Sequence, residues 1–144
     1  SWFMKSPVTE IKAVADVGAR THVDEHACYL LKYENGAISS LTSAMMVKKP
    51  SDGHIFGSKG RIDLTGRFYA AENFTVHVYG GESTEYHMPF YGNGFEEEIM
   101  EANACIRAGK LESDIMPHSQ SMLIMDQMDE IRELIGVKYP QDDQ

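Results

Sequence analysis

The chain has 144 residues, 42% of them hydrophobic, and a formal net charge of -9. A chain of this length hides roughly 70% of its unfolded surface, and no low-complexity tract interrupts it, so we predict one domain over residues 1–144. The acidic balance excludes the basic surface that nucleic acids or anionic membranes require. The sequence contains no bilayer-spanning apolar run and no signal peptide, so we expect a cytoplasmic protein without nucleic-acid or membrane partners.

The two cysteines point to a reducing compartment. Cys28 and Cys105 lie far apart in the sequence, and neither belongs to a CxxC pair. Such thiols fit free cysteines better than a disulfide framework, and we expect both to be buried.

The first two thirds of the chain have the pattern of β-strands. Short runs of β-branched and aromatic residues lie between turn signals, over Thr9–Val17, His26–Tyr33, Ala37–Val47, Gly53–Phe56, Arg61–Leu64, Asn73–Tyr79 and Thr84–Met88. Asn35-Gly36 favours a two-residue hairpin turn, because both residue types adopt the positive φ angles that such a turn needs. Pro50 cannot donate a backbone hydrogen bond, so strand pairing should lapse there. We predict a largely antiparallel meander of about seven strands.

A first helix is expected after this region. One helical stripe carries Phe95, Ile99, Ala102 and Ile106. Asn93 and Glu96 have the spacing of a capping box, and three successive glutamates place negative charge at the positive end of the helix dipole. Gly109 is a natural helix stop.

A second helix is expected over Ser119–Ile135 and should end at Gly136. Met122, Met125 and Met128 are expected to pack against the sheet. The predicted fold class is therefore α+β: an open, mostly antiparallel sheet of about six to eight strands with helices on one face. The other face is left free to bind a partner.

Two glycine-containing segments superficially suggest phosphate binding. Gly92-Asn93-Gly94 leads into a helix, but Glu97 stands where a dinucleotide fingerprint has its third glycine, and the neighbouring carboxylates would repel a pyrophosphate. The segment Gly57–Gly60 lacks the spacing and the following helix of a phosphate-binding loop. We interpret it as a hairpin turn.

The densest group of potential metal ligands is His22, Asp24, Glu25 and His26. On an extended strand, alternate residues are about 6 to 7 Å apart, too far to close a zinc site without other ligands. A polar strand entry is the favoured interpretation, with a metal site and a substrate-facing role as alternatives. No Ser-His-Asp or Cys-His arrangement can be assembled from the sequence.

Several segments resemble one known family. The segments are Val23-Asp24-Glu25, Ile55–Gly60, Phe95-Glu96, Cys105–Ser113, Met116–Ser119, Met128–Arg132 and Gly136–Pro140. Together they resemble the C-terminal domain of the glucose-fructose oxidoreductase and inositol dehydrogenase family, particularly members similar to dimeric dihydrodiol dehydrogenase. The resemblance covers essentially the whole chain. It implies an open antiparallel sheet with helices on one side, in agreement with the fold predicted from the residues.

The resemblance also implies where chemistry occurs. Complete family members begin with a Rossmann domain that binds NAD or NADP, and their proton-transferring residue precedes the first strand of the C-terminal domain. Ser1-Trp2-Phe3-Met4 looks like the end of the helix in question, so we expect the natural protein to begin upstream. No catalytic, cofactor-binding or metal-binding residue is therefore assigned, and no cofactor is expected on this chain alone.

A substrate-binding role is implied for one loop. In similar dehydrogenases, the loop before the penultimate helix leans over the nicotinamide, and Phe90, Tyr91 and Asn93 occupy it here. A turn without substrate contact is the alternative interpretation.

The free sheet face in this family forms the dimer. We therefore expect a homodimer, with Ser39, Leu41, Ser43 and Met45 as a flat contact surface. The predicted function is that of the C-terminal domain of an NAD(P)-dependent oxidoreductase acting on a sugar, cyclitol or diol. This domain would shape the substrate pocket and be inactive alone. The alternatives are a stand-alone binding or dimerisation module and an acidic structural subunit.

Overall fold

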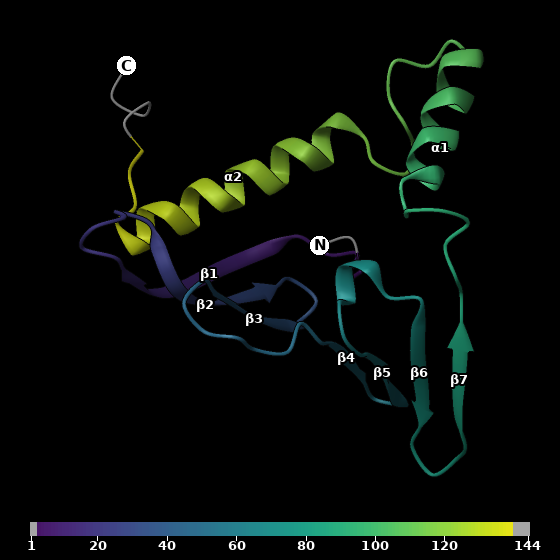
Figure 1. Ribbon diagram of the computed structural model, residues 1–144, viewed down its shortest axis with the longest axis horizontal. Helices are drawn as coiled ribbons and strands as arrows, with labels where there is room; N and C mark the ends of the chain where they lie inside the picture. Colours follow the sequence, from purple (N-terminus) through teal and green to yellow (C-terminus); the bar gives the residue numbers. More distant parts are fainter. Residues whose placement is uncertain (1–2, 140–144) are drawn as a thin grey trace. The chain divides into compact units, whose positions relative to one another are not determined.

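A computed structural model describes residues 3–139 and divides the chain into two units (Figure 1). The first unit, within Ser1–Lys48 and Met116–Gln144, contains strands β1 (Val8–Val17), β2 (Asp24–Tyr33) and β3 (Ile38–Ala44) and helix α2 (His118–Ile135). The second unit, Lys49–Ile115, contains β4 (Gly53–Gly57), β5 (Gly60–Leu64), the short helix η1 (Phe68–Ala70), β6 (Asn73–Val78), β7 (Ser83–His87) and α1 (Glu96–Arg107).

The predicted α+β class is confirmed, with seven antiparallel strands and two α-helices between residues 3 and 139. The strands form two open sheets instead of one, in the orders β1-β2-β3 and β4-β5-β6-β7. The expected lapse of pairing at Pro50 occurs, since this residue lies outside both sheets. Pro50, which has no backbone N–H to donate to a neighbouring strand, thus lies in the connection between the last strand of one sheet and the first strand of the next.

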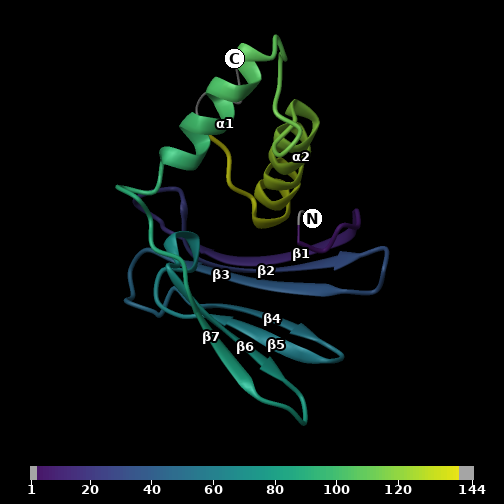
Figure 2. The same cartoon turned by 90° about the vertical axis from the view of Figure 1, so that its right-hand side faces the viewer.

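The core of the first unit lies between its sheet and α2. Ile11 and Leu31 are direct cross-strand partners, and both are buried together with Tyr33. Ile131 of α2 packs against this cluster. Figure 2 shows α2 along one face of the β1-β2-β3 sheet. Burying side chains of this size contributes about 1.5 to 3 kcal/mol each, so this cluster stabilises the helix on the sheet.

The hairpin between β2 and β3 has a three-residue loop, not the expected two-residue turn. Tyr33 N–H donates to Ala37 O (2.9 Å) and Gly36 N–H donates to Tyr33 O (2.9 Å), which encloses Glu34, Asn35 and Gly36. Of these three loop residues, only Gly36 has a positive φ, at 85°. This is the common arrangement of a tight turn followed by one left-handed residue.

This extra loop residue decides which face of β3 points to the helix. A two-residue turn would pair Ser39 with Lys32, whereas the observed register pairs Ser39 with the buried Leu31. Leu41 and Ser43 follow on the same face, and Ser39 Oγ donates to Tyr33 Oη (3.1 Å). The row expected to form a free dimer surface is therefore on the face that carries α2. A register change of one residue moves every side chain to the other face.

The predicted packing of the α2 methionines is wrong. Met122, Met125 and Met128 are 61%, 51% and 51% exposed. The helix meets the core cluster through Ile131, in its last turns. It ends at Gly136 (φ 73°), where Val137 N–H donates to Arg132 O (3.0 Å), so the predicted stop is confirmed.

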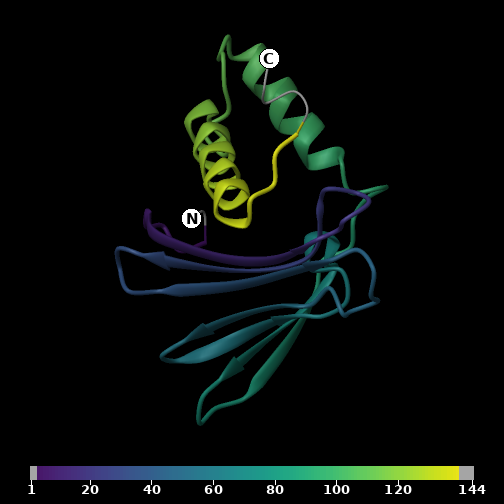
Figure 3. The same ribbon diagram turned by 90° about the vertical axis from the view of Figure 1, so that its left-hand side faces the viewer.

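The second unit is built on the β4-β5-β6-β7 meander (Figure 3). Gly57 and Gly60 pair directly, so the segment is the predicted hairpin turn. One face of the sheet is mostly polar, and its members are His54, Phe56, Arg61, Asp63, Asn73, Thr75, His77, Ser83, Glu85 and His87. The opposite face is apolar and carries Ile55, Ile62, Phe74, Val76 and Tyr86. The rings of Phe74 and Tyr86 stack with their centroids 4.8 Å apart.

Two smaller expectations fail or lie outside the described residues. Cys28 is exposed, whereas Cys105 is buried as expected. Phe3 and Met4 belong to a turn, and the remainder of the expected helix end, Ser1 and Trp2, lies outside the described range. Neither α-helix of residues 3–139 is long and apolar enough to cross a membrane.

Candidate functional site

The loop before α1 is anchored at its first end by Glu72. Met88 N–H donates to Glu72 O (2.7 Å), and Phe90 N–H donates to Glu72 Oε1 (3.0 Å). The Phe90 ring lies beside Gly94, whose φ of 93° suits glycine. A Cβ atom on Gly94 would lie 3.6 Å from that ring, so the aromatic side chain packs closely over the backbone.

The second end of the loop is held by Glu96. Its carboxylate accepts hydrogen bonds from Asn93 N–H (2.6 Å) and Gly94 N–H (2.9 Å), which is one half of the predicted capping box. Asn93 Oδ1 instead accepts the N–H of Phe95 (3.3 Å). The backbone N–H groups of Glu96 itself, then Asn93 and Gly94, hold the pKa of this carboxyl below its usual range.

The Glu96 hydrogen bonds also bear on nucleotide binding. A phosphate at a helix N-terminus needs backbone N–H groups that point toward it. The N–H groups of Asn93 and Gly94 already bind the Glu96 carboxylate. The residues of this loop therefore do not fit a pyrophosphate.

The three predicted substrate-loop residues do not share one surface. Tyr91 is 87% exposed and lines an open hollow of about 550 Å³ together with Glu96, Glu97, Ile99 and Met100 of α1. Phe90 and Asn93 do not line this hollow and instead shape the loop. Tyr91 is thus the member of the predicted set that borders this hollow.

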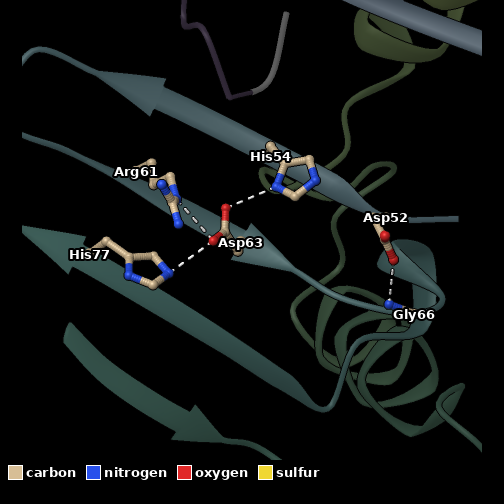
Figure 4. Close-up of polar contacts among 6 residues, drawn as sticks. All are labelled: Asp52, His54, Arg61, Asp63, Gly66 and His77. Carbon is tan, nitrogen blue, oxygen red and sulfur yellow. Dashed lines mark hydrogen bonds and ion pairs between the residues drawn. The ribbon is translucent and has the colours of Figure 1, made fainter. Parts of the chain in front are cut away.

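A second polar group, which the sequence did not reveal, surrounds Asp63 on β5 (Figure 4). Its Oδ1 lies 2.8 Å from His54 Nδ1 of β4, and its Oδ2 lies 2.9 Å from His77 Nε2 of β6. Arg61 Nε donates to the same Oδ2 (3.0 Å). In the sequence, alternation of polar and apolar residues along each strand could place these side chains on one face. Only the register of the three strands brings them together.

The Asp63 carboxylate is strongly stabilised in its charged form. The hydrogen bond from His54 is the main cause, and Arg61 and His77 add to it, so the pKa falls from 3.8 to about 2. A carboxyl whose pKa is lowered on folding stabilises the fold above its unfolded pKa. That contribution disappears as the pH falls through the folded value.

Replacing Asp63 with asparagine should therefore change the acid dependence of stability. The urea midpoint of the wild type is expected to exceed that of Asp63→Asn at neutral pH, and the difference should shrink between pH 3.8 and about 2. Urea titrations across this window measure it. Glu85→Gln removes a carboxylate from the same face without touching the cluster, and shows the effect of lost charge alone. A difference that stays constant down to pH 2 would contradict the assignment.

The group around His22 does not form a ligand set. β2 begins at Asp24, and His22 precedes it in a turn with φ 57°, so these residues do not continue one strand row. Thr21 Oγ1 donates to Glu25 Oε1 (2.9 Å), and Tyr29 Oη donates to Asp24 Oδ2 (3.0 Å). Within residues 3–139, no cluster of three histidine, cysteine or acidic residues has the geometry to hold a metal ion.

Comparisons with known proteins identify the family. A family model described as the GFO/IDH/MocA C-terminal domain matches residues 1–63. The trans-1,2-dihydrobenzene-1,2-diol dehydrogenase of Homo sapiens is 30% identical over 139 residues, covering 90% of this chain and 41% of that protein. The chain therefore spans about two fifths of the length of this relative.

Two solved structures share the fold. A UDP-N-acetylglucosamine 3-dehydrogenase from Acidithiobacillus ferrooxidans has a TM-score of 0.76 and 13% identity, covering 90% of this chain and 41% of its own. An aldose-aldose oxidoreductase from Caulobacter crescentus has a TM-score of 0.74 and 17% identity, with coverage of 90% and 39%. The resemblance seen in the sequence is thus confirmed: residues 1–63 match the GFO/IDH/MocA C-terminal domain, and the chain is homologous to the dihydrodiol dehydrogenases.

Proposed function

We propose that this chain is the C-terminal, substrate-binding part of an NAD(P)-dependent oxidoreductase that acts on the CH–OH group of a sugar, cyclitol or diol. The observation that carries the proposal is the 30% identity to a dihydrodiol dehydrogenase over 90% of the chain. The two solved relatives with the same fold are named as a sugar-nucleotide dehydrogenase and an aldose oxidoreductase, which supports the same substrate class. The expected location is the cytoplasm.

The cofactor is proposed to bind outside these 144 residues. The glycine-containing loop before α1 uses the N–H groups of Asn93 and Gly94 to hold Glu96, so it does not fit a dinucleotide. We therefore assign no step of hydride or proton transfer to a residue of this chain. The task proposed for this domain is to bind and orient the alcohol, which contributes to rate by positioning.

The substrate wall is proposed to include Phe90, Tyr91 and Asn93. Tyr91 would contact the substrate directly, because its ring is exposed and borders the hollow on α1. Phe90 packs over Gly94, and Asn93 accepts the Phe95 N–H, so these two would position the Tyr91 segment. A loop anchored at both ends presents its exposed side chain with little loss of conformational entropy on binding.

Changing Tyr91 tests this assignment. In the complete enzyme, Tyr91→Ala should lower kcat/KM for the alcohol by about tenfold, equivalent to roughly 1.4 kcal/mol of lost binding. Steady-state kinetics with saturating cofactor measure the change. Tyr79→Ala, which removes an exposed ring at the β6–β7 hairpin, is the matched control and should leave kcat/KM unchanged. Equal effects of the two variants would refute the role of Tyr91.

The function itself is tested on the complete protein, captured from its source cells with an antibody against this domain. Its intact mass should exceed this chain by a second domain of roughly 100 to 150 residues. It should reduce NAD⁺ or NADP⁺, followed at 340 nm, with a trans-dihydrodiol, a cyclitol or an aldose. The 144-residue chain alone should show no reduction. A complete protein of the same mass as this chain, or one that reduces neither cofactor, would favour the alternative of a stand-alone binding or dimerisation module.

A homodimer is also proposed, but through a different row of side chains from the one expected. The face of the β1-β2-β3 sheet opposite α2 carries Val14, Leu30 and Ile38, which are 69%, 50% and 65% exposed. Exposed apolar side chains on a flat sheet suit a symmetric contact between two copies. Sedimentation equilibrium at high micromolar concentration should give twice the monomer mass, and a monomer would count against the proposal.

A further inference from the structure

His77 on β6 has both ring nitrogens bound by side chains from its neighbouring strands. Its Nε2 lies 2.9 Å from Asp63 Oδ2 of β5, and its Nδ1 lies 2.8 Å from Ser83 Oγ of β7. Ser83 is the direct cross-strand partner of His77, so the two side chains share the polar face of the sheet. The order along this chain of contacts is serine, histidine, aspartate.

Chemistry determines where the protons lie in this arrangement. The lowered pKa of Asp63 keeps its carboxyl ionised at neutral pH, and an ionised carboxylate only accepts hydrogen bonds. His77 must therefore carry its proton on Nε2 and donate it to Asp63. In the neutral ring, Nδ1 then has the free lone pair, and the Ser83 hydroxyl donates to it.

We propose that Ser83, His77 and Asp63 form a nucleophilic relay, in which Ser83 reacts with activated acyl and phosphonyl compounds. A hydroxyl that donates to a histidine oriented by a carboxylate is the arrangement that activates serine on several unrelated folds. Ser83 and His77 are the catalytic residues of this reaction, and Asp63 is a positioning residue. This activity is separate from the proposed dehydrogenase function and does not depend on it.

The reaction with an activated ester balances as an acyl transfer. Ser83 Oγ forms a bond to the carbonyl carbon while its proton passes to His77 Nδ1, and Asp63 stabilises the resulting imidazolium. The bond to the leaving phenoxide then breaks, and the proton on His77 is released with the phenol. Water attacks the acyl-serine with the same base, which yields the acid and restores the Ser83 hydroxyl.

The position of the relay allows a reagent to reach it. Ser83 is exposed and begins β7, which is the edge strand of its sheet. The side chain of His77 is 28% exposed and that of Asp63 is 15% exposed. The Asp63 carboxylate contacts His54, Arg61 and His77. The nucleophile therefore faces solvent while the residue that orients the base is fixed, as a preorganised site requires.

The test is covalent labelling with a fluorophosphonate, followed by intact mass and peptide mapping. One phosphonyl group should appear on Ser83, and p-nitrophenyl acetate should give a burst of p-nitrophenol. Ser83→Ala should abolish both signals, and His77→Gln should slow labelling by about 100-fold or more, the typical contribution of a general base. Ser113→Ala is the matched control, because the Ser113 hydroxyl donates to the Glu101 carboxylate and not to a histidine. It should label at the wild-type rate.

The role of Asp63 has a separate readout. Asp63→Asn should slow labelling, and Asp63→Glu should restore part of the rate by returning a carboxylate to the His77 side of the site. Label mapping on the wild type keeps the test valid even if a variant fails to fold. An unlabelled wild type, a label on a residue other than Ser83, or equal labelling of wild type and Ser83→Ala would each overturn the proposal.

Discussion

Replacing Leu31 with alanine should lower the free energy of unfolding by about 2 to 5 kcal/mol, the range for large-to-small changes in a core. Leu31 is 7% exposed, pairs with Ile11 of β1, and belongs with it to the cluster against which Ile131 of α2 packs. The change removes apolar contacts from the cluster that supports α2. Urea denaturation followed by far-ultraviolet circular dichroism measures the loss.

The neighbouring residue provides a matched control for this prediction. Leu30 is the same residue type on the same strand, but it points to the opposite face and is 50% exposed. Leu30→Ala should change stability by no more than about 0.5 kcal/mol in the monomer, as surface substitutions usually do. If both variants lost stability equally, the assignment of the buried face of β2 would be wrong.

Replacing Gly60 with alanine should destabilise the second unit by about 1 to 3 kcal/mol or more, the cost of forcing extra atoms into a filled position. A Cβ atom at Gly60 would lie 2.1 Å from the backbone oxygen of His77 and 3.3 Å from the Cα of Val78. Backbone atoms of a paired strand cannot move aside as the end of a side chain can. The β5–β6 ladder must therefore open near the hairpin, and amide hydrogen exchange of β5 and β6 measures this.

Gly57 is the control for Gly60, because the two glycines pair across the same turn. A Cβ atom on Gly57 would have its nearest neighbour at 3.6 Å, an ordinary contact. Gly57→Ala should leave exchange in β5 and β6 near the wild-type rate. Faster exchange in both variants, to the same degree, would show that the turn needs glycine for flexibility and not for the close approach to His77.

Local signals in the sequence predicted most elements of the fold. Pro50 marked the interruption between the two sheets, because a residue without an N–H cannot continue a ladder. Gly109 and Gly136 marked the ends of the two helices, where both adopt positive φ angles. These effects act within a few residues of the chain. Breaks at proline and helix ends at glycine can therefore be recognised in the sequence without knowledge of the packing.

The site could be predicted only in part. The loop that carries Tyr91 is a candidate through resemblance to a family, and its anchoring by Glu96 was partly visible as capping-box spacing. The group around Asp63 was missed, because its members come from three strands and none has a distinctive spacing in the sequence. Ser83 was missed for the same reason.

By itself, the sequence determined the α+β class, the order of the strands and helices, and the family. Only the tertiary structure decided which side chains face each other. One additional residue in the loop ending at Gly36 turned Ser39 and Leu41 toward α2, and cross-strand register brought Asp63, His77 and Ser83 into contact. The physical reason is that turn and helix-end preferences act locally, whereas strand register depends on how two separate segments align, and a shift of one residue reverses both faces.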